Sequence, residues 1–120
     1  MIEYVLSKAR EIPYVKGEQR IFSAIFDKRN RLVAESPCLY RKSHPRQKDL
    51  SVRTGFEEGR CNLHSEVNAL IKSRGRGCKI VIARVGANGR PLDAHPCPSC
   101  SLAIKEATWI KSVEYSLEQM

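Results

Sequence analysis

The chain has 120 residues, of which 42% are hydrophobic and 28% are charged, the composition of one globular domain spanning 1–120. Its longest apolar runs, such as 80–83, fall far short of the roughly 20 residues that a membrane span needs. The 21 Lys and Arg residues outnumber the 13 Asp and Glu residues, and the net charge of +8 suits either an anionic partner such as nucleic acid or a well-solvated surface.

The first half of the chain predicts a helix followed by a β-hairpin. Residues 2–11 carry an apolar stripe at helical spacing, and Pro13 stops the helix. Residues 20–27 form an apolar run typical of a strand, and a short turn leads into a second strand at 31–35. Residues 36–60 are polar and rich in turn formers, so we expect a long loop there, of a kind that is often functional.

The second half alternates helices and strands. We expect a helix at 63–72 with Asn62 as its N-cap and glycines after its end. Residues 78–85 form a nearly continuous apolar strand, which is typical of the centre of a sheet. A helix at 96–108 and an alternating strand at 112–117 follow. This order of elements predicts an α/β sandwich.

The cysteine usage favours a reducing compartment. The chain has five cysteines, an odd number, and its first residues lack the basic region and the long apolar stretch of a secretory signal. A disulfide framework is therefore not expected, and we expect the protein to be cytoplasmic.

Two short stretches, each at the start of a predicted helix, carry residue types that bind metals. Cys97 and Cys100 are three positions apart, so one helical turn places both thiolates on the same face. His64, at the start of the other helix, brings the set to three, the number of protein ligands that a catalytic Zn²⁺ ion has. Both helix N-termini carry partial positive charge, which favours thiolates such as those of Cys97 and Cys100.

Glu66 completes this set as a candidate proton carrier. It lies two residues after His64 and need not point at the ion itself. Zinc lowers the pKa of a bound water towards about 7. Glu66 can reach such a water, take its proton and carry it to a substrate. The H-x-E…P-C-x-x-C pattern belongs to zinc deaminases, which hydrolyse the amine from a cytosine or adenine ring. A structural zinc site, with Cys61 or Cys78 as a fourth ligand, is the alternative interpretation.

Residues 64–70 (His-Ser-Glu-Val-Asn-Ala-Leu) and 96–100 (Pro-Cys-Pro-Ser-Cys) resemble the cytidine deaminase superfamily. The likeness is to the CMP/dCMP deaminase type, a branch that includes tRNA adenosine deaminases and polynucleotide cytosine deaminases. In element order it extends over about residues 18–118. The resemblance implies a three-layer α/β sandwich with a central mixed sheet of about four to five strands, whose core helices carry the zinc site.

The resemblance also implies an activity and its components. His64, Cys97 and Cys100 would bind one catalytic Zn²⁺ ion per chain, and Glu66 would be the proton shuttle. The implied reaction is hydrolytic deamination of a cytosine base to uracil, in a nucleotide or in single-stranded nucleic acid, with a place in nucleotide metabolism or nucleic acid editing. An adenine deaminase acting on nucleic acid and a non-catalytic, zinc-stabilised nucleic-acid-binding module are the alternatives.

Several features depart from the pattern of the family. Cys38 stands near the position where many members have an Asn that hydrogen-bonds the sugar. The segment 37–45 replaces the Gly-Tyr-Asn-Gly loop of dCMP deaminases, which favours nucleic acid as substrate, whereas the short chain and the sequence of 64–69 favour a nucleotide. Ser65 replaces a common alanine, a small-for-small exchange to which we attach no function. Relatives usually continue further after the fourth strand, so we expect a minimal domain or a homo-oligomer.

The excess positive charge is concentrated in two segments. Residues 41–53 hold five Lys and Arg residues against one Asp, and residues 72–90 hold six with no acid. The cations at 72–79 suit the C-terminal end of the predicted helix, far from the zinc. In the family, the long loop and the end of the third strand border the pocket. For the pair His44-Pro45 in this sequence, a structural turn is the alternative interpretation. The resulting candidates for substrate contacts are Cys38, Tyr40, Arg41, Lys42, His44, Arg84, Arg90 and His95.

Overall fold

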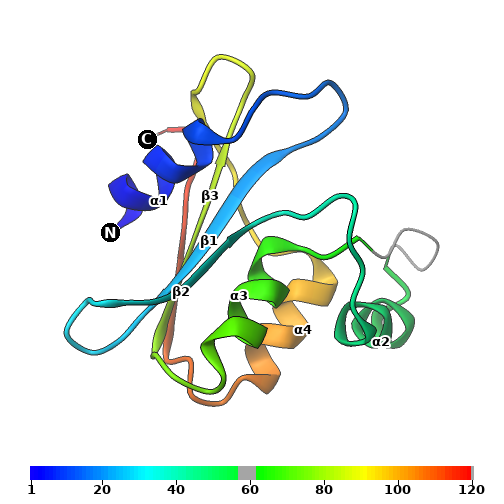
Figure 1. Cartoon of the computed structure of the whole chain (residues 1–120). Coiled ribbons are helices and arrows are strands. Elements are labelled where there is room, and N and C mark those ends of the chain that lie inside the picture. The colour runs from blue at the N-terminus through cyan, green and yellow to red at the C-terminus, as the bar shows by residue number, and fades with distance from the viewer. Residues whose placement is uncertain (57–61, 120) are drawn as a thin grey trace.

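The computed structural model describes residues 1–56 and 62–119, and within these ranges it contains four helices and five strands (Figure 1). The helices are α1 (Ile2–Glu11), α2 (Pro45–Thr54), α3 (Ser65–Ser73) and α4 (Pro98–Glu106). The strands are β1 (Arg20–Phe26), β2 (Leu32–Pro37), β3 (Lys79–Val85), β4 (Pro91–Leu92) and β5 (Ser112–Tyr115). The predicted α/β class is confirmed.

The strands form one mixed sheet with β3 near its centre. β1 pairs antiparallel with both β2 and β3, so the strand order runs β2-β1-β3. Two short strands share the other edge of β3: β4 pairs antiparallel with its last residues, and β5 pairs parallel with its first four. The predicted mixed sheet is therefore confirmed, with five strands in the described part of the chain.

Successive side chains of the central strands face two different helical layers, as the pleat of a strand requires. On one face, Val81 is buried in a cluster with Val5 of α1. On the other face, its neighbour Ile82 is buried in a cluster with Ala69 of α3, against which Ile104 of α4 also packs. Figure 1 shows α1 on one side of the sheet and α3 and α4 on the other. The result is the α/β sandwich that the order of elements predicts, with the three layers that the resemblance implies.

The prediction of a long loop at 36–60 is wrong in its middle, since Pro45–Thr54 forms α2. The buried residues of α2 are Gln47, Leu50 and Ser51, only one of which is apolar. Apolar periodicity, the main sequence signal of a helix, is therefore weak in this segment. Residues 57–60 of the same predicted loop lie outside the described residues.

The ends of α2 carry the local signals that specify it. Nδ1 of His44 accepts a hydrogen bond from the N–H of Arg46 at 3.0 Å, and Pro45 occupies the first turn, where an N–H donor is not needed. Gly55 follows the helix with a φ of 72°, a left-handed conformation that glycine adopts without steric cost. His44 and Pro45 thus begin a helix rather than form an isolated turn.

The predicted N-cap of α3 is wrong, because His64 and not Asn62 occupies that position. Leu63 forms an isolated β-bridge with Leu39, and its N–H donates to the carbonyl oxygen of Lys42 at 2.8 Å. The backbone is therefore still extended where the sequence predicts the start of the helix. The bridge holds the residues just after β2 next to the residues just before α3.

The other predicted elements are confirmed with small shifts at their ends. The helix at 2–11 has the predicted bounds, and the strand predicted at 31–35 extends to Pro37. The helix predicted at 96–108 is shorter and spans Pro98–Glu106. None of the helices in the described part of the chain is long and apolar enough to cross a membrane.

Candidate metal centre

The starts of α3 and α4 bring one histidine and two cysteines together. His64 is the N-cap of α3, Cys97 is the N-cap of α4, and Cys100 lies in the first turn of α4. Nδ1 of His64 lies 3.3 Å from Sγ of Cys100 and 3.5 Å from Sγ of Cys97. The three ligand atoms all lie within 4.8 Å of one another. The structure therefore brings together the three residues that the sequence predicts as metal ligands.

These distances and atom types fit a metal ion. Tetrahedral zinc takes sulfur at about 2.3 Å and imidazole nitrogen at about 2.0 Å, which sets two such ligand atoms about 3.5 Å apart. The Nδ1–Sγ distances of 3.3 and 3.5 Å are close to that separation. One imidazole and two thiolates are also ligands that Zn²⁺ accepts, so this group could hold one such ion. No other group of this kind occurs among the described residues.

Local backbone geometry makes these side chains converge. Pro98 occupies the first turn of α4, and Cys97 ahead of it has an extended backbone with a ψ of 169°. The N–H of Cys100 lies 3.5 Å from Sγ of Cys97, so the start of α4 directs a donor at that sulfur. The imidazole of His64 does not cap α3, and its Nδ1 instead lies next to the two sulfurs.

The two thiols have different electrostatic surroundings. A hydrogen bond with the Cys100 thiol, together with His64, lowers the pKa of Cys97 to about 4. The same hydrogen bond, together with burial, raises the pKa of Cys100 well above its ordinary value. Two neighbouring thiolates repel each other, and a divalent cation between them removes this repulsion. The chemistry of the pair therefore suits a cation that binds both sulfurs.

Glu66 lies in the first turn of α3 and is 6% exposed. Its Oε1 accepts a hydrogen bond from the hydroxyl of Ser65 at 2.8 Å, and that hydroxyl lies 2.7 Å from Oγ of Ser23 on β1. Burial raises the pKa of the Glu66 carboxyl, and the nearby Cys97 acts in the same direction. A carboxyl that holds its proton more tightly than usual is suited to transferring protons near neutral pH.

Glu66 and two of the three candidate metal ligands line one cavity. Its volume is about 550 Å³, within the range of small-molecule sites, and Glu66, His64 and Cys97 all line it. The other described lining residues are Gly17, Gln19, Ile21, Cys38, Tyr40, Phe56, Asn62, Arg84, Asp93, Ala94 and His95. The fold thus places a carboxylate and a possible metal site in the wall of the same small-molecule-sized space.

The structure divides the predicted substrate contacts into two groups. Those that line the cavity are Cys38, Tyr40, Arg84 and His95. Those that are not among its described lining residues are Arg41, Lys42, His44 and Arg90. His44 instead caps α2. For both groups, contact with a substrate stays a prediction.

Asn62 lines the cavity, although the sequence predicts it as a helix cap. Its Nδ2 lies 3.7 Å from Sγ of Cys38, the residue directly after β2. Burial, and secondly the charge of Glu66, raises the pKa of Cys38 to about 12, so this thiol is protonated at neutral pH. Side chains two positions apart in extended backbone project to the same side. Asn62 stands two positions before His64, and this spacing is the sequence signal that could have predicted its place in the cavity wall.

Of the two cysteines considered as a fourth ligand, the one within the described residues gives no support to a four-ligand structural site. Cys78 precedes β3, at the opposite end of that strand from Arg84, and it is not part of the metal-ligand group. Cys61 lies outside the described residues. Within the described part of the chain the group therefore has three protein ligands, the number found in catalytic zinc sites.

Comparison with known proteins assigns no family to the chain. No protein-family model matches it, and no curated protein matches it. The likeness to cytidine deaminases therefore depends on the motif residues and on the order of the elements.

Proposed function

We propose that the chain is a zinc-dependent hydrolytic deaminase of the CMP/dCMP type, which converts a cytosine base to uracil and releases ammonia. The observation that carries the proposal is that the carboxylate of Glu66 lines the same cavity as His64 and Cys97. A structural zinc site needs no carboxylate beside it, whereas a hydrolytic site needs a group that moves a proton. The resemblance of residues 64–70 and 96–100 to cytidine deaminases supports the same activity and favours cytosine over adenine.

In this proposal His64, Cys97 and Cys100 hold one zinc ion. When bound, zinc supplies a Lewis acid that makes hydroxide available at neutral pH. Glu66 takes one proton from the attacking water and delivers it to a ring nitrogen, and it then moves the second proton from the added hydroxyl to the amine, which leaves as ammonia. A C–O bond forms at the ring carbon that bears the amine, and the C–N bond to the amine then breaks.

A positive charge in the cavity wall favours a substrate that carries a phosphate. Arg84 is the only Lys or Arg among the described lining residues. Its Nη1 lies 3.5 Å from the carbonyl oxygen of Asp93, which keeps the guanidinium near the cavity. Arginine is a common phosphate contact, and both a nucleotide and a single-stranded nucleic acid place a phosphate near the base. The proposal therefore covers cytosine in either kind of molecule.

The test is incubation of the zinc-loaded protein with dCMP, CMP, cytidine and single-stranded oligonucleotides. Replacement of the amine by oxygen adds about 1 Da, so mass spectrometry of the products identifies each substrate that is converted. Oligonucleotides that contain adenine and no cytosine test the other base in the same assay. We expect the wild-type chain to convert a cytosine substrate.

Glu66→Gln separates catalysis from zinc binding. The amide keeps the shape of the side chain but accepts no proton, so we expect turnover to fall by about 10²–10⁴-fold while zinc content stays the same. Glu118→Gln makes the same exchange at an exposed residue and should keep full turnover. Zinc binding by the wild type without conversion of any substrate would reject the deaminase and favour the non-catalytic zinc-stabilised module.

A further inference from the structure

The helix α2 contacts both segments that carry the metal ligands, although none of the three ligands belongs to it. Figure 1 shows α2 beside α4. Leu50 of α2 is fully buried in one cluster with Val67 of α3 and with Cys100. Three sets of polar contacts add to this apolar packing, and each connects α2 with a different part of the metal centre or of α4.

Gln47 makes the contact with the first metal-bearing segment. Its side chain is 1% exposed, and its Oε1 accepts a hydrogen bond from the N–H of His64 at 3.1 Å. The contact therefore holds the backbone of a metal ligand at the point where the chain enters α3. A buried amide costs free energy unless it is hydrogen-bonded. The fold is therefore most stable when the Gln47 side chain and the N–H of His64 keep this hydrogen bond.

Thr54 makes the contact with the second metal-bearing segment. Its Oγ1 lies 3.0 Å from Oγ of Ser99, a fully buried residue between Cys97 and Cys100 in the first turn of α4. The Thr54 hydroxyl donates its one hydrogen to the carbonyl oxygen of Leu50 at 2.8 Å, so Ser99 donates to Thr54. This hydrogen bond ties the turn that holds both cysteines to the end of α2.

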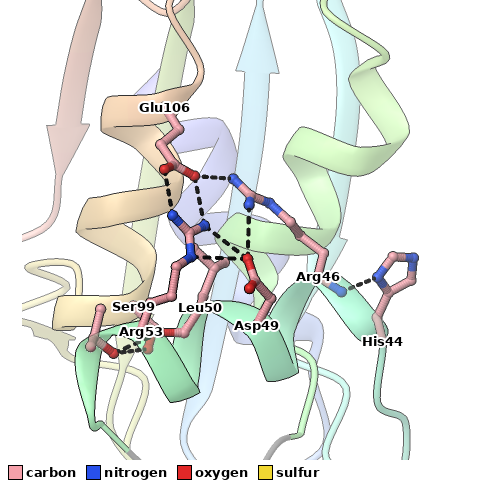
Figure 2. Close-up of polar contacts among 8 residues, drawn as sticks. His44, Arg46, Asp49, Leu50, Arg53, Ser99 and Glu106 are labelled. Carbon is pink, nitrogen blue, oxygen red and sulfur yellow. Dashed lines mark hydrogen bonds and ion pairs between the residues drawn. The ribbon is translucent and has the colours of Figure 1, made fainter.

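Ion pairs connect α2 with the last turn of α4 (Figure 2). Glu106 accepts hydrogen bonds from both terminal nitrogens of Arg53, at 2.7 and 2.9 Å, and from Arg46 at 2.8 Å. Asp49 lies between the two guanidinium groups, 2.9 Å from Arg53 and 3.6 Å from Arg46. The position of α2 is therefore set against both the first and the last turn of α4.

We infer that α2 positions the two halves of the metal centre relative to each other, with Gln47 as the positioning residue for His64. The inference rests on the metal site of the proposed function and adds an element to it. His64 and Cys97 are 33 residues apart and belong to different helices, so local backbone geometry does not set the distance between them. Gln47 and Thr54 set it from a single helix, and supporting contacts of this kind preorganise a metal site.

The test compares the metal affinity of Gln47→Met and Gln47→Glu with that of the wild type. Met keeps the length of the side chain but offers no oxygen to the N–H of His64, whereas Glu keeps an oxygen acceptor. Competition with a chromophoric chelator measures Zn²⁺ affinity, and the visible absorption of the Co²⁺-loaded protein reports tetrahedral geometry. We expect Gln47→Met to bind Zn²⁺ about 10–100-fold more weakly with an altered Co²⁺ spectrum, and Gln47→Glu to stay within about threefold of the wild type.

Ser51→Ala, at another buried residue of α2, controls for a general loss of helix stability and should keep wild-type affinity. Circular dichroism checks that each variant is folded. The inference is overturned if folded Gln47→Met binds Zn²⁺ as tightly as the wild type, or if Gln47→Glu loses as much affinity as Gln47→Met. If Gln47→Met does not fold, Ser99→Ala tests the second contact, with the same expected loss and the same overturning result.

The two proposals fail in distinguishable ways. A wild-type chain that binds neither Zn²⁺ nor Co²⁺ overturns both the positioning role of Gln47 and the proposed deaminase. A wild-type chain that binds zinc through Gln47-dependent geometry but deaminates no base leaves the positioning role standing and rejects only the activity.

Discussion

Ser65 links the candidate proton carrier to the centre of the sheet. It is 1% exposed, and its hydroxyl donates its single hydrogen to Oε1 of Glu66 at 2.8 Å. The hydroxyl of Ser23 on β1, 2.7 Å away and fully buried, therefore donates to Ser65. Two hydrogen bonds in series thus orient the carboxylate of Glu66 from the middle of the sheet, a role that an alanine at position 65 does not fill.

Ser65→Ala tests the strength of this pair of hydrogen bonds. The change leaves the Ser23 hydroxyl buried without its partner, so we expect the free energy of unfolding to fall by about 1–3 kcal/mol. Urea unfolding measures the loss. Ser101→Ala, at an exposed residue of α4, is the matched control, with an expected change below about 0.5 kcal/mol. Equal urea midpoints for the wild type and Ser65→Ala would contradict the prediction.

At the scale of elements, charges hold α2 against α4. Glu106 lies in the last turn of α4, where a negative charge opposes the helix dipole. Hydrogen bonds from Arg53, and secondly from Arg46, lower the pKa of Glu106 from its ordinary 4.5 to about 2. The folded chain therefore favours the ionised carboxylate. Because these side chains are partly exposed, solvent and salt weaken the effect.

The contribution of Glu106 to stability should disappear in acid. Because its pKa is lower in the folded chain than its ordinary 4.5, its charge stabilises the fold above that pH and ceases to do so as the pH falls towards about 2. Glu106→Gln lacks this titration, while Asp49, the other carboxylate of the cluster, remains. Urea midpoints of the two chains should differ at about pH 6 and approach each other near pH 2. A difference that does not depend on pH would refute this assignment.

The connection from α3 to β3 depends on Gly77. Its φ is 89°, and a Cβ at this position would collide with Cγ2 of Ile25 and lie 3.3 Å from the carbonyl oxygen of Phe26. Ile25 is fully buried, so it cannot move aside easily. Gly75 has a similar φ of 79°, but nothing lies within 4 Å of a Cβ built there. Substitution at Gly75 would therefore introduce backbone strain alone, whereas substitution at Gly77 would introduce strain and a steric collision.

Replacing each glycine by alanine measures the two effects. Gly75→Ala should destabilise the fold by about 1 kcal/mol, because alanine is strained in the left-handed region. Gly77→Ala should cost about 2–4 kcal/mol, because overpacking against the sheet adds to the same strain. Thermal or urea unfolding gives both values. Equal losses would mean that Ile25 and the sheet adjust without cost.

At the scale of the whole molecule, the candidate metal ligands come from parts of the chain that are far apart in sequence. His64 precedes α3, and the two cysteines lie at the start of α4. Both helices pack on the face of the sheet that contains Ile25 and Ile82. The unfolded chain does not hold these three side chains together, so binding of a metal ion to the group would be coupled to folding.

Removal of zinc should therefore lower the Tm. Free zinc at 100 times its Kd stabilises a folded chain by about 2.7 kcal/mol when the unfolded chain does not bind it. Calorimetry with and without a chelator measures the shift for the wild type. Cys97→Ser should abolish the zinc-dependent shift, whereas Cys78→Ser, at a free thiol outside the metal-ligand group, should keep it. A Tm that zinc does not change in the wild type would exclude the metal centre.

Most elements of the fold could be predicted because their apolar patterns are strong. The run at 78–85 is a central strand because its side chains are buried on both faces of the sheet. The stripe at 2–11 marks the helix that covers one of these faces. The segment 45–54 carries no such stripe, since two of its three buried residues are polar, and its hydrogen bonds to distant partners are not visible in the sequence. The two residues of β4 are too few to form any pattern.

By itself, the sequence identified His64, Cys97 and Cys100 as candidate metal ligands and Glu66 as a candidate proton carrier. One helical turn brings Cys97 and Cys100 together, and the two short motifs at 64–66 and 96–100 mark the other residues. Only the tertiary structure decided what surrounds them. It brings Gln47 to the N–H of His64. It also pairs Arg53, one of the excess cations, with Glu106 and does not direct it to the cavity. These contacts join segments 17 and 53 residues apart. A distance of that kind depends on how helices pack on the sheet, and no local rule of spacing encodes it.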